Sequence, residues 1–283
     1  MESINFSVSI CVYGKDNHKY FDVALESVVF QTIEPTEIVL TVDGPIPKTI
    51  EDVIRKYEII LKEKNIAFKI IRLEKNMGHG EARRICFDNC SYDLIAIMDA
   101  DDISVTNRFE KQIAFLKENP ELSVVGGVIT EFITKENIKD TSCIAGNRIV
   151  PKTNEEIKIF MKKRCPMNQV TVMFKKNDVS EVGGYIDWFC EEDYYLWIRL
   201  ALAGKGFGNI EQKLVNVRVG DEMYQRRGGI EYFKSEVKLQ KYMLDKKMID
   251  FRRFLINVGE RFILQVLMPS RIRGWLFRKL ARN

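Results

Sequence analysis

Strand and helix patterns alternate along the first hundred residues of the chain. The segments of strand character are FSVSICV (6–12), EIVLTVDG (37–44), AFKIIRLE (67–74) and LIAIMD (94–99). Segments of helical periodicity lie between them at 20–32, 49–65 and 78–90. This order predicts an α/β fold with a mostly parallel sheet and helices on both faces, in which ligands bind beyond the carboxyl ends of the strands.

The pattern becomes more mixed after Asp102. Helices are predicted at 106–118, at 154–164 and from the acidic residues near 191 onward, and strands at 122–132, 169–174 and 213–219, with an irregular stretch before 152. From about residue 228 the chain has a helical pattern throughout. We therefore expect one domain over residues 1–227, with halves 1–103 and 104–227, followed by a helical extension over 228–283.

The composition is that of a soluble globular protein. The 283 residues are 46% hydrophobic and 30% charged, and no apolar run approaches the roughly 20 residues that a spanning helix needs. The first residues carry Glu2 and alternate apolar side chains with serine, so we expect a strand there, not a signal peptide, in a cytoplasmic protein. Six cysteines without a C-x-x-C pair, and only two histidines, argue against zinc.

The net charge of +4 is unevenly distributed. Between residues 250 and 283, eight basic residues accompany two acidic ones, so this segment carries +6 and the remaining chain −2. The main domain has no basic excess of its own, and we expect no nucleic-acid partner.

Three carboxylates, those of Asp99, Asp101 and Asp102, follow the fourth strand segment. They repel one another unless a cation or backbone donors offset their charge. A divalent metal is one solution, because Mn²⁺ and Mg²⁺ bind one or two carboxylates together with phosphate oxygens. The alternative is ordinary turn and cap chemistry, since aspartate also ends strands and begins helices.

The order of the motifs resembles that of the family 2 inverting glycosyltransferases, which have the GT-A fold. The motifs are FSVSICVYG, VDG, EKNMGHGEARR, LIAIMDADD followed by RFEKQ, and EEDYYLW preceded by GGY. The match covers roughly residues 6–230, and its strength lies in the co-occurrence of motifs that are weak singly. The string VRVGDEMYQRRGG (217–229) is further similar to a subgroup of bacterial transferases for capsule, O-antigen and exopolysaccharide.

The resemblance implies a reaction and a division of the domain. A nucleotide sugar, taken to be a UDP-hexose or UDP-N-acetylhexosamine, would bind to residues 1–103, with Mn²⁺ or Mg²⁺ neutralising the diphosphate leaving group. A glycan or lipid-linked saccharide acceptor would bind to residues 104–227 and receive the sugar in a β linkage.

Five residues are implied at the donor site. Asp99 would face the ribose and the metal, and Asp101 would bind the metal directly; alternate residues leaving a strand can place their side chains on one side. Asp43 would hydrogen-bond the nucleobase edge, although an Asp-Gly turn is an alternative reading. The backbone around Val12 and Tyr13 would flank the base, with the Tyr13 ring as a stacking face.

Arginines are the second implied group. Arg83 matches a family arginine near the nucleotide; alternatively, Arg83 and Arg84 form a solvated helix face. Arg218, Arg226 and Arg227 follow the last strand, where relatives have a basic segment that closes over the diphosphate. A surface basic patch is the alternative for these three.

Inversion in a single displacement needs a general base that takes the proton of the acceptor hydroxyl. The resemblance assigns this role to Asp193 in EEDYYLW, where Glu191 and Glu192 precede it. Three acids opening a helix are also common helix-dipole chemistry. Relatives commonly have a histidine where this chain has Gln169, which leaves the acceptor-side contacts open.

The basic segment at the end of the chain has two readings. RIRGWLFRKLAR (271–282) interleaves apolar residues with cations, so residues 250–283 can form a peripheral contact with the cytoplasmic face of an anionic membrane. The same apolar stripe would also allow docking on the main domain.

Two other functions are compatible with parts of the sequence. GHGEAR (78–83), with Asp99 further along, weakly imitates a dinucleotide fingerprint, which would indicate an oxidoreductase. It lacks the third glycine and follows the third strand instead of the first. A non-catalytic nucleotide-sugar-binding protein is the other alternative, against which Asp99, Asp101 and Asp193 together argue.

Overall fold

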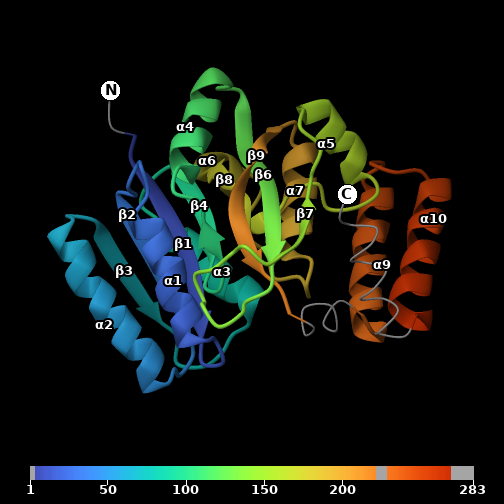
Figure 1. Cartoon of the computed structure of the whole chain (residues 1–283). Helices are drawn as coiled ribbons and strands as arrows, with labels where there is room; N and C mark the ends of the chain where they lie inside the picture. The colour runs from blue at the N-terminus through green and yellow to red at the C-terminus, as the bar shows by residue number, and fades with distance from the viewer. Residues whose placement is uncertain (1–3, 221–227, 269–283) are drawn as a thin grey trace.

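The structure is a computed structural model, and it describes residues 4–220 and 228–268. One curved sheet of nine strands forms the centre, with helices on both faces (Figure 1). The strand order is β3-β2-β1-β4-β8-β6-β9-β5, and β7 pairs with the outer part of β6. No helix in the described ranges is long and apolar enough to cross a membrane.

The first half is the predicted parallel βα series. Its elements are β1 (Phe6–Tyr13), α1 (His18–Val29), β2 (Glu37–Asp43), α2 (Lys48–Glu63), β3 (Ala67–Arg72), α3 (His79–Asn89) and β4 (Leu94–Asp99). Val8, Ile10 and Val12 of β1 point into the core formed with α1, α2 and α4 (Arg108–Glu118). Cys11 packs on the opposite face with α3, because successive strand side chains alternate between faces.

The second half extends the sheet with antiparallel and parallel neighbours. It contains β5 (Ile103–Ser104), β6 (Leu122–Phe132), β7 (Ile144–Arg148), α5 (Asn154–Met161), β8 (Met173–Lys175), α6 (Lys176–Glu181), α7 (Glu192–Leu202) and β9 (Gly206–Arg218). β8 runs antiparallel to both β4 and β6, whereas β6 and β9 are parallel. The sheet is therefore mixed, as expected for the GT-A fold.

Three predicted boundaries in this half are wrong. The strand predicted at 169–174 begins as a single helical turn, η1 (Gln169–Thr171), because the Thr171 hydroxyl donates to the Asn168 carbonyl at 2.7 Å and so stabilises a turn. The last strand starts at Gly206, well before 213, where glycines weaken the alternating pattern. The irregular stretch before 152 contains β7.

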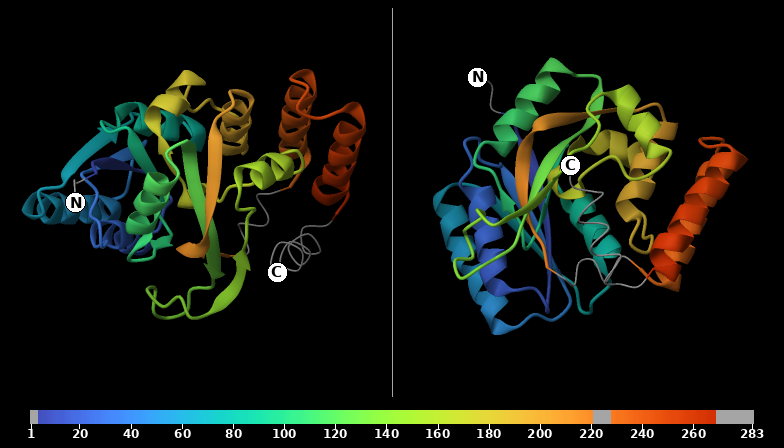
Figure 2. Two further views of the ribbon diagram at one scale, coloured as in Figure 1. Left: turned by 90° about the horizontal axis from the view of Figure 1, so that it is seen from above. Right: turned by 45° about the vertical axis from the view of Figure 1, so that its right-hand side comes forward.

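Two helices and a π-helical turn follow the main domain: α9 (Ile230–Asp245), α10 (Phe251–Arg261) and η2 (Phe262–Leu267). The two helices pack beside α5 and α7 (Figure 2). Leu239 and Met243 of α9 are buried in the same cluster as Trp197 of α7. The described part of the helical extension, residues 228–268, thus docks on the main domain. The predicted interfacial segment 271–282 lies outside the described residues.

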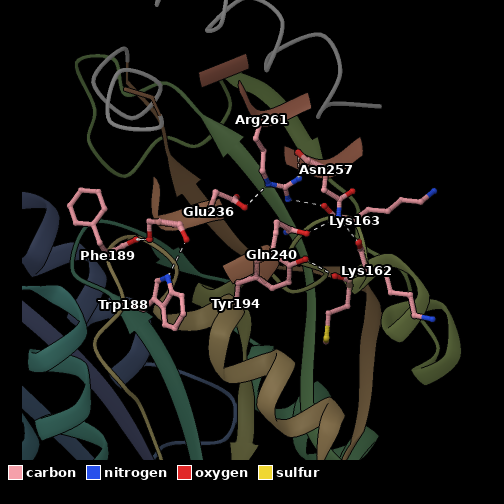
Figure 3. A network of polar contacts seen from close by, with 11 residues as sticks. Lys162, Lys163, Trp188, Phe189, Tyr194, Glu236, Gln240, Asn257 and Arg261 are labelled. Atoms are coloured by element: carbon pink, nitrogen blue, oxygen red, sulfur yellow. Dashed lines mark hydrogen bonds and ion pairs between the residues drawn. The ribbon is translucent and has the colours of Figure 1, made fainter. Parts of the chain in front are cut away.

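Polar contacts join these helices to the domain (Figure 3). Arg261 Nε donates to Glu236 Oε2 at 2.5 Å, and Arg261 Nη2 donates to the Lys163 carbonyl at 2.8 Å. Asn257 Nδ2 donates to Gln240 Oε1 at 2.7 Å and to the Lys162 carbonyl at 2.9 Å. These bonds tie α10 to both α9 and the end of α5.

Candidate active site

The parallel strands bring the predicted donor-site residues to one edge of the sheet. Tyr13, the last residue of β1, lies opposite Asp43, the last residue of β2. On the other side of β1, Cys11 lies opposite Asp99, the last residue of β4. The carboxyl ends of β1, β2 and β4 therefore meet where α/β sheets bind their ligands.

The three acids after β4 have different environments. The Asp99 side chain is 32% exposed, and Asp101 is exposed in the following turn. Asp102 is only 3% exposed. Burial, and then the charges of Asp101 and Asp99, raise the pKa of Asp102 well above its usual value. Asp99 and Asp101 are thus accessible to a ligand, whereas Asp102 faces the protein.

Asp102 and Arg218 fix the acidic turn. The Arg218 backbone N–H donates to Asp102 Oδ1 at 2.8 Å, and Arg218 Nε donates to the Asp101 carbonyl at 3.0 Å. The other guanidinium nitrogens of Arg218 donate to the Thr134 hydroxyl and, at 3.1 Å, to the Ile138 carbonyl. Burial lowers the pKa of Arg218 from its usual value. Asp102, to which the sequence motifs assign no separate role, therefore anchors β9 to the turn.

The predicted diphosphate contact of Arg218 competes with this structural role. Arg218 is the last residue of β9, and its guanidinium also lies 3.9 Å from the centre of the Tyr20 ring. A donor phosphate would have to share nitrogens that already donate within the protein. The predicted contacts of Arg226 and Arg227 fall outside the described residues.

Arg83 of α3 connects Asp99, at the end of β4, to His79 at the start of α3. It is 5% exposed; its Nη2 donates to Asp99 Oδ1 at 2.7 Å, and its Nε donates to His79 Nε2 at 2.6 Å. Burial works to lower the pKa of Arg83, but the Asp99 carboxylate holds it above its usual range. Arg84, by contrast, pairs with Glu81 on the helix surface. Of the two arginines, only Arg84 fits the alternative of a solvated helix face.

The first turn of α7 reaches the same region through Glu192. Glu192 Oε1 lies 3.9 Å from His79 Nε2. Burial, and then the charge of Asp193, raise the pKa of Glu192 to about 7, while Arg83 opposes the shift. Because Asp99 also acts on Glu192, the end of β4 and the start of α7 lie within electrostatic reach of each other.

Asp193 is half-buried in the first turn of α7. Its Oδ1 accepts the N–H of Tyr194 at 2.6 Å. Acidic residues in the first turn favour the helix start through the dipole, so the structural role predicted for them is present. This position is also compatible with a base that approaches the reaction centre from the acceptor side, a role that stays a prediction.

Glu191 links this turn to the C-terminal helices. It is 5% exposed, and burial, followed by the charges of Glu236 and Asp193, raises its pKa well above the usual value. Glu236 pairs in turn with Arg261 of α10 (Figure 3). A residue of the helical extension therefore contacts the acid two positions before Asp193, which no local sequence signal indicated.

Asp43 and the residues around it hold the connection from β3 to α3. Met77 N–H donates to Asp43 Oδ1 at 2.6 Å, and Gly78 N–H donates to Oδ2 at 3.1 Å. Val12 is buried in the core, so only its backbone faces the sheet edge, while Tyr13 is partly exposed beside it. The nucleobase contacts of these residues stay predictions, and the structure adds an anchoring role for Asp43.

Gln169 lies in η1, in the second half of the domain. Its Nε2 donates to the Tyr185 hydroxyl at 2.9 Å. Its Oε1 is buried and has no hydrogen-bond partner in the described part of the chain. Gln169 thus supports the GGY turn that precedes α7 through Tyr185.

Asp99 and Asp101 alone cannot fill the coordination shell of a divalent cation, so a bound ligand would have to supply further oxygens. Across 4–220 and 228–268, no group of three or more His, Cys, Asp or Glu side chains is arranged to hold a metal. Two accessible carboxylates supply part of a coordination shell, and Mn²⁺ or Mg²⁺ commonly completes such a shell with phosphate oxygens and water. The residues present therefore fit a cation that binds together with a diphosphate.

Known proteins are similar in sequence to this chain over nearly its whole length. A protein named only as an uncharacterized glycosyltransferase of Haemophilus influenzae is 40% identical, over 99% of this chain and 100% of its own. The UDP-Gal:alpha-D-GlcNAc-diphosphoundecaprenol beta-1,3-galactosyltransferase of Escherichia coli is 34% identical, over 98% and 97%. The amylovoran biosynthesis glycosyltransferase AmsE of Erwinia amylovora is 34% identical, over 97% and 98%.

Solved structures share the fold at low sequence identity. Staphylococcus aureus TarS 1–349 in complex with UDP-GlcNAc superposes with a TM-score of 0.64 at 15% identity, over 92% of this chain and 73% of that one. The mannosyltransferase PcManGT of Pyrobaculum calidifontis, in complex with GDP-Man and Mn²⁺, gives 0.61 at 11% identity, over 99% and 76%. The family model for glycosyl transferase family 2 matches residues 7–179. This chain therefore belongs to glycosyltransferase family 2 and is a glycosyltransferase with the GT-A fold.

Proposed function

We propose that this glycosyltransferase is a metal-dependent, inverting enzyme that transfers a hexose or N-acetylhexosamine from a UDP-sugar to a hydroxyl of a lipid-linked saccharide, in surface polysaccharide synthesis. The observation that carries the proposal is that two acidic segments lie near each other. Asp99 ends β4, Asp193 lies in the first turn of α7, and Arg83 bonds to Asp99 and interacts with Glu192, the residue before Asp193.

At the donor side, the chain's own residues hold and orient the diphosphate. Asp99 and Asp101 would bind a divalent cation, which supplies charge neutralisation for the departing nucleoside diphosphate. Arg83 holds the Asp99 carboxylate in one orientation through the 2.7 Å bond. Asp102 and Arg218 hold the turn so that Asp101 keeps its exposed position.

At the acceptor side, Asp193 accepts the proton of the attacking hydroxyl. The oxygen then bonds to the anomeric carbon as the bond to the diphosphate breaks, which inverts the configuration and gives a β product from an α-linked donor. Burial of Glu191 and Glu192 raises the pKa of both, so neither carries a full charge as readily as an exposed acid.

The relatives support the substrate classes. The Escherichia coli relative is named for transfer of galactose from UDP-Gal to a GlcNAc joined to undecaprenol through a diphosphate, in a beta-1,3 linkage. The Erwinia amylovora relative is named for amylovoran biosynthesis. Coverage of at least 97% in both directions supports a similar donor nucleotide and a lipid-linked acceptor here.

Asp43 argues against the dinucleotide alternative. In a dinucleotide-binding turn, the backbone N–H groups before the helix bind the pyrophosphate. Here the N–H groups of Met77 and Gly78, which precede α3, donate to the Asp43 carboxylate. The GHGEAR segment thus has a different use in this fold.

A donor panel tests the proposal. UDP-Gal, UDP-Glc, UDP-GalNAc and UDP-GlcNAc would be incubated with a GlcNAc-diphosphate-lipid acceptor and Mn²⁺, with EDTA as control, scoring both transfer and hydrolysis. We expect transfer from one UDP-sugar, loss of transfer with EDTA, and a β anomeric signal in the product. Calorimetric binding of NAD but not UDP would overturn the proposal, as would transfer that survives EDTA.

A further inference from the structure

The faces of α10 and η2 are reversed relative to those of an ordinary surface helix. A helix packed on a globular domain normally turns its apolar stripe inward and its polar residues outward. Here the buried residues are Asn257, Arg261 and Gln265, at 0%, 8% and 7% exposure. Their spacing of four places them on one side of the helix. The fully buried side chains of α10 and η2 are therefore polar, although the partly buried Phe254 also packs against the core cluster.

Each of these inward residues is held by a specific contact. Asn257 and Arg261 donate to carbonyls at the end of α5 and to Gln240 and Glu236 of α9. For Gln265 the contact is through its backbone, whose carbonyl accepts the N–H of Gly229 at 3.0 Å. The rotation of the helix about its axis is therefore fixed by hydrogen bonds, and the outward face follows from it.

The outward face is mainly apolar, although Arg252 and Glu260 are also exposed on α10. Its large exposed side chains are Phe251 (64%), Leu255 (54%), Ile256 (40%), Phe262 (39%), Ile263 (53%) and Leu267 (62%). Ile230, at the start of α9, is also exposed, to 52%, and its neighbour Gly229 is hydrogen-bonded to η2. We call these seven residues the apolar face. Single exposed apolar residues are normal, but a contiguous set marks a contact with another molecule or a membrane.

The charges around the apolar face favour an anionic lipid surface. On α10, Arg252 and Glu260 are both exposed, so the basic excess comes from the sequence after η2. That sequence lies outside the described residues and contains Arg271, Arg273, Arg278, Lys279 and Arg282, interleaved with Ile272, Trp275, Leu276 and Leu280. Apolar residues flanked by cations are the composition of interfacial membrane segments, where each cation adds attraction to anionic lipid. A protein interface would instead be depleted in such charge at its core.

The position of the apolar face relates it to the acceptor side. Ile230 begins α9, and Tyr232, in the first turn of that helix, hydrogen-bonds Glu191. Glu191 stands two residues before Asp193. One residue of the apolar face, Ile230, thus belongs to α9, the helix that also contacts Glu191 just before the candidate base Asp193.

We propose that the apolar face of α9, α10 and η2 lies on an anionic membrane and presents the α7 end of the site to acceptors embedded in that membrane. The second half of this statement rests on the proposed function, but the membrane contact itself does not. The protein would bind lipid with or without a donor sugar.

Vesicle flotation with the full chain tests this. Phosphatidylglycerol-containing vesicles would be compared with pure phosphatidylcholine vesicles, using wild type, Leu255→Ser/Ile263→Ser and the control Ile59→Ser. Ile59 is exposed to 62% on α2, remote from α10 in sequence and in the fold, so it matches the substituted residues. We expect wild type and control to float with anionic vesicles, and the double variant to bind at least about 10-fold more weakly.

The outcomes separate this proposal from the proposed function. Equal flotation of all three proteins would overturn it, as would a failure of wild type to bind anionic vesicles. If sedimentation shows that wild type is a dimer which the double variant dissociates, the face is an interface between copies and the proposal is also overturned. Flotation without any sugar transfer would leave the membrane contact standing and refute only the proposed function.

Transfer activity adds a second readout for the double variant. Its turnover with a water-soluble acceptor analogue should match wild type, since Leu255 and Ile263 touch neither candidate acid nor the donor site. Its turnover with the lipid-linked acceptor in vesicles should fall in parallel with binding. An equal loss with both acceptors would indicate damage to the fold and count against the proposal.

Discussion

Replacement of Arg261 by methionine should detach the C-terminal helices from the domain. The Arg261–Glu236 pair has side-chain exposures of only 10% and 9%, and Arg261 also donates to the Lys163 carbonyl at 2.8 Å. Methionine keeps much of the side-chain volume but supplies none of these donors. Glu236 would then be a buried carboxylate next to Glu191, without a cation.

The magnitude follows from this burial. Removing one partner of a buried ion pair costs about 3–5 kcal/mol, because the other charge is left uncompensated. For a chain of this size, 1 kcal/mol corresponds to roughly 2–4 °C in Tm. We therefore expect Arg261→Met to lower the free energy of unfolding by about 4 kcal/mol and Tm by about 10 °C.

Urea denaturation followed by circular dichroism would measure the effect. Arg261→Met/Glu236→Gln should recover most of the loss, because a neutral amide replaces the stranded carboxylate, and Arg252→Met, on the exposed side of α10, should change Tm by less than about 2 °C. The reasoning would be refuted if Arg261→Met cost less than about 1 kcal/mol, or if the Glu236 substitution gave no recovery.

Three further changes test the site. Asp99→Asn should remove the Mn²⁺-dependent part of UDP binding in calorimetry, whereas equal Mn²⁺ enhancement in both proteins would contradict a metal role. Glu191→Gln should raise Tm relative to wild type more at pH 8 than at pH 5. Because the pKa of Glu191 in the folded protein is raised above 4.5, the stability contributed by its protonated form is complete below pH 4.5 and is lost as pH rises. A Tm difference independent of pH would refute this. Arg218→Lys should lower the free energy of unfolding by about 1–3 kcal/mol, because lysine cannot reach Thr134 and Ile138 together with the acidic turn; an unchanged urea midpoint would argue against the anchoring role.

Sequence periodicity was sufficient for the first half of the fold. The strands of β1, β2 and β4 are buried on both faces, so their apolar runs are long and their ends are marked by polar residues. Their parallel register then brings Tyr13, Asp43 and Asp99 to one edge, as predicted. The start of α7 at Glu192 was likewise readable, because the acids follow a glycine turn and precede an apolar helical pattern.

The remaining features depend on contacts between residues distant in sequence. β7 carries a weak pattern, IAGNR, and forms because β6 offers it a partner edge. The hydrogen bond from Arg218 to Asp102 joins residues 116 positions apart in the sequence. The Glu236–Glu191 contact joins the helical extension to the main domain. Periodicity records which face of an element is buried, but it does not record the element against which that face packs.

The most direct test of the proposed function is a comparison of Asp193→Asn with wild type in donor binding and sugar transfer. Glu155→Gln, an acid in the first turn of α5, controls for the loss of a helix-start charge. With Asp193 as general base, Asp193→Asn should bind UDP and Mn²⁺ as wild type does while transfer falls by on the order of 10²-fold or more, and Glu155→Gln should transfer normally. Near-normal turnover of Asp193→Asn would contradict the assignment of Asp193 and, with it, the mechanism proposed for this site.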